Sequence, residues 1–341
     1  MASSVKYVLV IAALILTTVF SLKLGAVSAS WADVRGVFDT DPDAVSRAIL
    51  NLRWPRIVGA AVVGCYLAVA GLLFQILLRN PLADPTIFGV SSGAALAVVI
   101  AMNIVIALGS GTEGGASASY LPTQLVPPIA MGGALCASFA VVALAWKKGM
   151  QPLRLLLFGA VLAVVLNGAV MTLVLSLSEA RTELAILWLA GSLYARDIAD
   201  VLPGLWWGLG CFLAIGFYAR SLSALRFDRD TARAMGVETK VAVPVLLLAA
   251  AALAASAVAI AGPVGFVGLL VPHITRLVFG PSVRHMLLGS ALFGALLVML
   301  SDLVGRMIAP PLELPVGIVT SLIGAPFFAV LIRQSLRKVA L

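Results

Sequence analysis

The chain has 341 residues, of which 62% are hydrophobic and only 11% are charged, and its mean hydropathy is +1.10. Soluble domains carry about 45–50% apolar and roughly 25% charged residues, so this composition excludes a soluble protein. The formal net charge is +8, but the basic residues lie between apolar runs and form no single stripe. This distribution favours membrane orientation signals over a nucleic-acid surface, and we predict an integral membrane protein.

Apolar runs recur along the whole chain, and each is long enough to cross a bilayer as a helix of about 20 residues. We therefore predict an all-α fold with one transmembrane domain over residues 1–341. The ten predicted spans lie near 7–25, 57–77, 87–108, 126–146, 154–177, 201–219, 241–261, 264–280, 286–304 and 314–332. Between them, 26–52 and 109–125 are predicted loops, 184–194 predicts an extra surface helix, and 220–240 is the most highly charged segment.

Both ends of the chain are predicted to be cytoplasmic. With the N-terminus inside and ten crossings, 15 of the 23 Lys and Arg residues fall on the inner side, as the positive-inside rule requires. Val27-Ser28-Ala29 is similar to a secretory cleavage site, but Lys23 interrupts the region before it, so we predict an uncleaved first helix. Because 264–280 contains Pro272 and several glycines, we expect a broken helix there that faces the protein interior.

Residues that would carry other functions are sparse. The chain has no GxxxxGK[ST] loop, so it does not bind ATP through that motif. Its three cysteines have no CxxC spacing and it has only two histidines, so no metal site is predicted. The deepest acidic residue, Asp302, lies near an outer helix end, four residues before Arg306. These absences disfavour two alternatives, an ion-coupled secondary transporter and a membrane-embedded enzyme.

Three segments combine prolines and glycines in unusual density. The first is Arg79-Asn80-Pro81-Leu82-Ala83-Asp84-Pro85 with the following Gly89, the second runs from Gly262 to Arg276, and the third begins at Leu314. Taken alone, they favour rigid turns, close helix contacts and a hydrogen-bonded structural histidine. The residues singled out in these motifs are Asn80, Pro81, Asp84, Pro85, Gly89, Pro272, His273, Pro315 and Gly317.

Together with Arg53-Trp54-Pro55-Arg56, these segments resemble the permeases of the FecCD family, the membrane subunits of ABC importers for iron-siderophores, haem and cobalamin. The resemblance runs from about residue 50 to the end of the chain. It implies a type II ABC importer permease in the bacterial inner membrane. It also implies three kinds of partner: a second permease, two ATPases that bind ATP and Mg²⁺, and a periplasmic binding protein. The chain itself would bind no cofactor.

The resemblance also assigns roles to individual residues. Arg53, Arg56 and Arg306 match arginines that meet acidic residues of the binding protein; the alternative is that they anchor helix ends. The charged segment 220–240 matches the place where the family contacts its ATPase, although a solvated linker remains an alternative. The residues expected at this contact are Asp230, Ala232, Arg233, Ala234, Met235, Gly236 and Val237.

The translocation pathway is expected to follow the fifth, eighth and tenth spans, as in the family. By position, its residues would be Asn167, Met171, Ser178, Gly265 and Gly268. Asn167 either faces the pathway or bonds to a neighbouring helix. A ferric siderophore is the expected substrate because the stretch from Trp188 to Leu193 is similar to siderophore permeases; haem and cobalamin are the alternatives. Siderophore permeases of the family often pair as heterodimers and the others as homodimers, and both arrangements stay open here.

Overall fold

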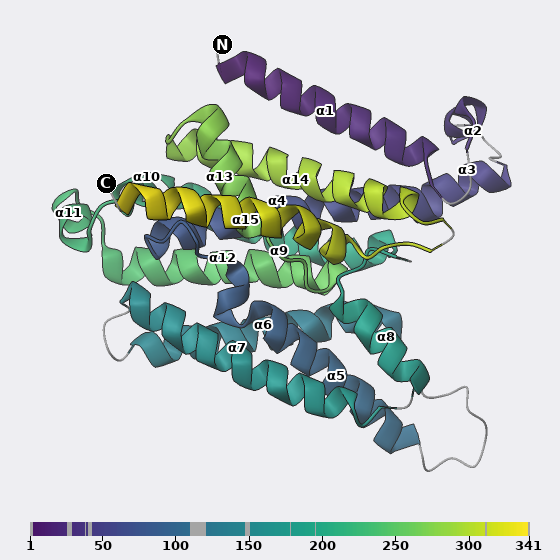
Figure 1. Ribbon diagram of the computed structural model, residues 1–341, viewed down its shortest axis with the longest axis horizontal. Helices are drawn as coiled ribbons and strands as arrows, with labels where there is room; N and C mark the ends of the chain where they lie inside the picture. The colour runs from purple at the N-terminus through teal and green to yellow at the C-terminus, as the bar shows by residue number, and fades with distance from the viewer. Residues whose placement is uncertain are drawn as a thin grey trace.

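The computed structural model describes residues 3–25, 29–37, 39, 43–109, 121–146, 151–177, 179–194, 196–310 and 312–339. Within these residues the chain forms a bundle of helices without a strand (Figure 1). The all-α prediction is therefore confirmed.

Ten helices correspond to the ten predicted spans. They are α1 (Ser3–Lys23), α4 (Trp54–Leu77), α5 (Val90–Gly109), α6 (Val126–Trp146), α7 (Pro152–Val174), α9 (Ile198–Phe217), α12 (Thr239–Ala261), α13 (Val267–Phe279), α14 (Val283–Met307) and α15 (Val316–Val339). Seven of them are long and apolar enough to cross a membrane unaided, and α5, α13 and α15 contribute shorter apolar helices. The described residues thus support a multi-pass membrane protein.

Short helices connect several of these spans: α2 (Trp31–Gly36), α3 (Ala44–Ala48), α8 (Glu179–Leu189), α10 (Ala219–Ala224), α11 (Arg229–Ala234), and the 3₁₀ and π turns η1 (Ile49–Arg53), η2 (Pro85–Phe88) and η3 (Thr123–Leu125). The prediction of a plain loop over 26–52 was wrong, because α2 and α3 form there. Ser30 and Asp33 cap α2 reciprocally, and the Asp43 side chain accepts a hydrogen bond from the Ser46 amide at the start of α3. The extra surface helix expected near 184–194 is α8.

The centre of the bundle is formed by α4 and α12. In each, 83% of the most apolar window is buried, against 17% in α1 and α7, which therefore lie at the periphery. Glycines let α4 approach its neighbours closely: a Cβ on Gly64 would lie 2.0 Å from the Gly294 carbonyl oxygen, and one on Gly71 would lie 2.0 Å from the Gly268 carbonyl oxygen. These contacts hold α14 and α13 directly against α4, as small residues do in membrane bundles.

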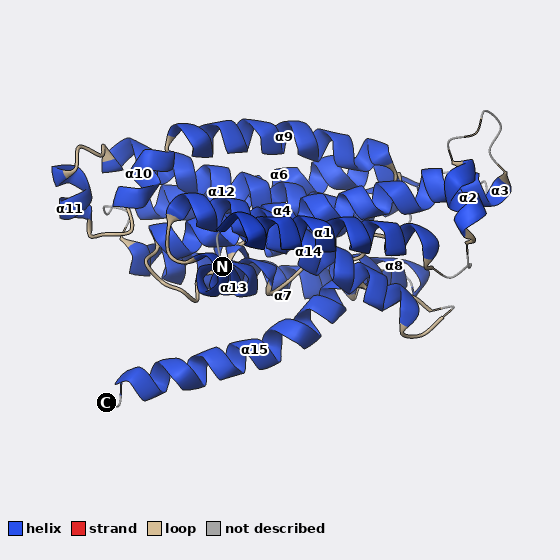
Figure 2. Ribbon diagram, turned by 90° about the horizontal axis from the view of Figure 1, so that it is seen from above, coloured by secondary structure: helices blue, strands red, loops and turns tan. Residues whose placement is uncertain are grey.

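The ends of the chain lie at the same end of the bundle, which also carries α10 and α11, while α2, α3 and α8 lie at the opposite end (Figure 1). An even number of crossings requires this arrangement. Seen from above, α15 leans away from the other helices toward its C-terminal end (Figure 2). The helix α15 therefore leaves part of its surface without an intramolecular neighbour.

Candidate translocation pathway and contact surfaces

The segment between α12 and α13 is the main irregularity of the bundle. Gly262 ends α12 with φ 72°, and Phe266 adopts the left-handed region with φ 66° before α13 begins. The left-handed region is uncommon for a residue other than glycine. Over its 13 residues, α13 is about 20 Å long, which is shorter than the roughly 30 Å hydrocarbon core. Residues 264–266 of the predicted span 264–280 are not helical, and α13 is a short helix that packs on α4 and α14, in line with the expected broken helix that faces the interior.

Three segments distant in sequence meet at this break. The Gly317 amide donates a hydrogen bond to the Gly191 carbonyl at 3.1 Å. A Cβ on Gly191 would lie 2.1 Å from the Pro263 carbonyl oxygen, and one on Gly317 would lie 2.4 Å from the Ala190 carbonyl oxygen. Gly191 and Gly317 thus allow backbone to approach backbone, which is how irregular chain is tolerated at membrane depth.

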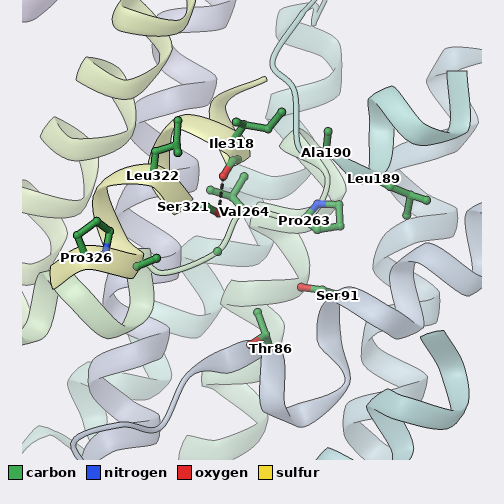
Figure 3. A pocket seen from close by; sticks show the side chains of 13 residues that line it. Thr86, Ser91, Leu189, Ala190, Pro263, Val264, Ile318, Ser321, Leu322 and Pro326 are labelled. Atoms are coloured by element: carbon green, nitrogen blue, oxygen red, sulfur yellow. Dashed lines mark hydrogen bonds between the residues drawn. The ribbon is translucent and has the colours of Figure 1, made fainter. Parts of the chain in front are cut away.

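A cavity of about 640 Å³ opens beside this junction (Figure 3). Its walls come from η2, α5, the end of α8, the break before α13 and the first half of α15, and the lining residues are Thr86, Ser91, Leu189, Ala190, Pro263, Val264, Gly265, Gly317, Ile318, Ser321, Leu322, Ala325 and Pro326. No charged side chain is among them. The Ser321 hydroxyl donates to the Gly317 carbonyl at 2.7 Å. Such a cavity suits an occupant held by shape and apolar contact better than a coordinated ion.

The first motif forms a capped turn that supports the cavity wall. The Asn80 side chain accepts a hydrogen bond from the Leu82 amide, and the Asp84 side chain accepts one from the Thr86 amide, each at 2.9 Å. Pro85 then begins η2, and Gly89 ends it in the left-handed region with φ 71°. These residues act as local caps and turn formers, in line with the rigid turn that the sequence favoured.

The first motif also contacts the second motif directly. A Cβ on Gly268 would lie 2.8 Å from the Pro85 ring, and the Gln75 side-chain amide donates to the Gly268 carbonyl at 3.2 Å. Gly268 is therefore a packing position between α4, η2 and α13. Pro272 is buried within α13, and the His273 ring lies edge-on to Phe327 of α15 with centroids 5.7 Å apart.

The outer arginines have partners within the chain. Arg56 Nε donates to Asp302 Oδ1 at 2.8 Å and its Nη1 donates to Glu313 Oε2 at 2.6 Å. Arg306 Nε lies 3.2 Å from Asp302 Oδ2, in an ion pair that lacks the angle of a hydrogen bond. The Arg306 side chain is only 3% exposed. Glu313, which sequence reasoning missed, completes this cluster.

Two of the outer arginines, Arg53 and Arg306, contact the C-terminal end of α1. Arg53 Nη1 donates to the carbonyls of Leu22 at 2.5 Å and of Lys23 at 3.1 Å. Arg306 Nη1 lies 3.4 Å from the Leu24 carbonyl oxygen. Cations at a helix C-terminus satisfy its free carbonyls and interact favourably with its dipole. The cluster therefore holds α1, α4 and α14 together at one end of the bundle. The role of these arginines in docking the binding protein stays a prediction.

The charged segment 220–240 folds as α10, α11 and the turn after α11. The Asp228 side chain accepts a hydrogen bond from the Thr231 amide at 2.7 Å, which caps α11. Hydrogen bonding from the Thr231 side chain and then from its backbone lowers the pKa of the Asp228 carboxyl. At the other end, the Val237 amide donates to the Ala232 carbonyl and the Gly236 amide to the Arg233 carbonyl. This pair of bonds is a Schellman motif with Gly236 at φ 83°. The segment from Ala232 to Val237 thus ends α11.

The residues of this segment differ in their exposure: some pack against the bundle and others face outward. Ala232 is fully buried and fixes α11 to the bundle, whereas the Met235 side chain is 60% exposed at the tip. Asp230 is 90% exposed and forms a surface ion pair with Arg233 at 3.4 Å, and Arg233 also donates to the Thr239 hydroxyl. An exposed apolar tip on a rigid turn is suited to contact another protein.

A family model described as the FecCD transport family matches residues 13–334. The chain belongs to this family. As a FecCD-family protein it is the permease subunit of an ABC transporter and lies in the cytoplasmic membrane. The family resemblance read from the sequence is therefore confirmed.

Individual relatives cover most of this FecCD-family chain. The cobalamin import system permease protein BtuC of Halobacterium salinarum is 39% identical over 86% of this chain and 75% of its own length. The achromobactin transport system permease protein CbrC of Dickeya dadantii is 37% identical over 92% and 87%, respectively. The iron(3+)-hydroxamate import system permease protein FhuG of Bacillus subtilis is 33% identical over 96% and 97%.

A solved structure extends the similarity to the fold. It is described as an inward-facing conformation of a metal-chelate type ABC transporter, and it matches with a TM-score of 0.80 at 29% identity. The match covers 95% of this chain and 97% of that chain. The permease fold of a type II ABC importer is thus confirmed for this FecCD-family chain.

The predicted pathway residues of this permease do not gather in one place. Gly265 lines the cavity, whereas Gly268 is a packing position. Asn167 and Met171 lie on the exposed face of α7, where Met171 is 64% exposed. Ser178 lies outside the described residues. A pathway role for these positions stays a prediction.

Proposed function

We propose that this permease moves a bulky ferric siderophore into the cytoplasm as part of an ATP-driven importer. The observation that carries the proposal is the family match over residues 13–334, together with an uncharged cavity of about 640 Å³ at the break before α13. A chelated iron ion has its coordination sites filled by the chelator, so it needs a smooth cavity and no protein ligands. The hydroxamate relative supports an iron chelate, and the cobalamin relative supports the alternative.

The proposed machine contains further subunits. A second permease, identical or different, would pair with this chain, with the exposed faces of α7 and α15 between them. Two ATPases would bind ATP and Mg²⁺ and contact α10, α11 and Met235. Closure of the ATPases would push these short helices and change the access of the cavity between the outside and the cytoplasm.

The binding protein is proposed to dock at the opposite end, over Arg53, Arg56 and Arg306. Arg53 lies beside the Arg56 and Arg306 cluster, and guanidinium groups form well-aligned contacts with the carboxylates of an acidic partner. Because Arg306 is buried, Arg53 is the better probe. We expect Arg53→Glu to weaken binding of the cognate binding protein about tenfold at low salt and less at high salt. Equal affinities of Arg53→Glu and wild type, measured by biolayer interferometry on nanodiscs, would contradict this docking site.

Uptake assays test the substrate. Cells that lack the chain and cells that express it would receive radiolabelled iron as a hydroxamate siderophore, labelled haem or labelled cobalamin. We expect chain-dependent uptake of the iron siderophore only. Leu322→Trp, which fills the cavity, should lower it at least tenfold, whereas Leu213→Trp on α9 provides a control because Leu213 is 68% exposed and does not line the cavity.

Three outcomes would overturn parts of the proposal. Uptake of haem or cobalamin in place of the siderophore would show that the proposed substrate is wrong, although the chain would still belong to an importer. Uptake that an ionophore abolishes and vanadate leaves intact would support the ion-coupled alternative. Equal loss of uptake in the Leu322 and Leu213 variants would show that the cavity is not part of the translocation pathway.

A further inference from the structure

We propose that the corner between α13 and α14 binds the headgroup of an anionic phospholipid. The site, named here the basic corner, consists of Lys6, Arg276, Arg284 and His285, with Tyr7 beside them and Arg226 at its edge. This inference rests on the membrane location of the chain and is independent of the transported substrate.

Contacts with the turn after α13 bring these side chains together. Lys6 Nζ donates to the Val278 carbonyl at 2.5 Å, and Arg226 donates to the Pro281 carbonyl at 2.5 Å. The Tyr7 ring stacks on Phe279 with centroids 4.4 Å apart and lies 6.1 Å from the His285 ring. Figures 1 and 2 both place the first turns of α1 beside this end of α13. Arg276 interacts electrostatically with Arg226, and Arg284 with Tyr7, so four helices or loops present basic groups at one corner.

The positive charge of the basic corner is not neutralised by the chain. Among the described residues, none of the four cations Lys6, Arg226, Arg276 and Arg284 forms an ion pair with a carboxylate, in contrast to Arg56, Arg233 and Arg306. Cations close together repel one another, so they favour an external anion.

Two buried donors at the corner lack an acceptor. Arg276 Nε and the Tyr7 hydroxyl are shielded from solvent, and neither has a hydrogen-bond partner within the described part of the chain. An unpaired buried donor is costly, and buried polar groups in folded proteins nearly always have partners. A phosphate group offers several acceptor oxygens and negative charge, which suits unpaired donors that lie among cations.

The surface around the corner identifies a lipid as the source of that phosphate. Exposed apolar side chains lie directly beside the cations, with Val8 at 64%, Leu9 at 56%, Leu277 at 73% and Leu288 at 51% exposure. In a membrane-embedded chain these side chains contact acyl chains. Basic groups next to such a surface at a membrane interface are the arrangement that binds anionic headgroups.

The test is native mass spectrometry of the full chain in nanodiscs that contain phosphatidylcholine and a variable fraction of phosphatidylglycerol. We expect wild type to retain phosphatidylglycerol selectively, and Arg276→Gln/Arg284→Gln to weaken that binding about fivefold per charge, roughly 25-fold in all. The control is Lys240→Gln/Arg333→Gln, because these cations are exposed at the same end of the bundle on α12 and α15. It should change binding less than twofold. Arg276→Lys/Arg284→Lys, which keeps the charge, should restore most of the binding.

Each other outcome overturns the proposal. Equal lipid retention by the two double Gln variants would mean that only total charge matters. Displacement of the lipid by millimolar inorganic phosphate would identify a free-anion site. Intact lipid binding with loss of a co-purified ATPase in the Arg276/Arg284 variant would assign the basic corner to a protein contact.

Discussion

Asp302→Ala is expected to lower the free energy of unfolding by about 3–5 kcal/mol, because it leaves two buried guanidinium groups short of a counter-charge. Asp302 and Arg306 are each 3% exposed, and the Arg56 side chain is 11% exposed. In this variant Arg56 still forms its ion pair with Glu313, whereas Arg306 retains hydrogen bonds only to backbone carbonyls at the C-terminal end of α1. The apparent melting temperature of the purified chain in detergent should fall by roughly 10 °C.

A matched substitution separates burial from charge. Asp230→Ala removes the same side chain from another Asp–Arg pair, but Asp230 is 90% exposed, so the melting temperature should barely change. The double variant Asp302→Leu/Arg306→Met should recover part of the loss, since it replaces the ion pair with apolar contacts and leaves Arg56 with Glu313. A melting temperature of Asp302→Ala equal to that of Asp230→Ala would show that the cluster does not stabilise the fold.

Met235→Glu is expected to reduce uptake at least tenfold while leaving the folded chain intact. Met235 is the exposed tip of the turn after α11, so a carboxylate there alters the proposed ATPase contact and not the core. In proteoliposomes with the cognate ATPase, hydrolysis should continue but should no longer rise when loaded binding protein is added.

Met235→Leu is the control, because it retains an apolar side chain of similar size, and it should transport normally. Full transport by Met235→Glu would contradict a coupling role and would favour the solvated linker that the sequence left open.

Local signals in the sequence predicted much of this molecule. The apolar runs predicted all ten spans, because length and hydropathy are properties of the chain itself. The i,i+4 spacing of Asp302 and Arg306 placed an acid and a base on one face of a helix, and they do pair at 3.2 Å.

Long-range contacts explain what the sequence did not predict. Glu313 meets Arg56 across 257 positions, a pairing that depends on the packing of α4 against α14. Likewise, the length of α13 depends on backbone contacts among Gly191, Pro263 and Gly317, which no local pattern encodes. The caps of α2 and α3 were visible in the sequence as Ser30, Asp33 and Asp43, but the polar composition of 26–52 favoured a loop.

Gentle purification of the tagged chain from its native membrane, followed by mass spectrometry of the proteins that accompany it, tests the importer most directly. We expect an ATPase with Walker motifs in stoichiometric amount, and a second, different permease if the substrate is a ferric siderophore. The Met235→Glu variant should recover less of the ATPase than Met235→Leu does. Recovery of the chain without any ATPase, also after cross-linking in intact membranes, would contradict the ATP-driven mechanism.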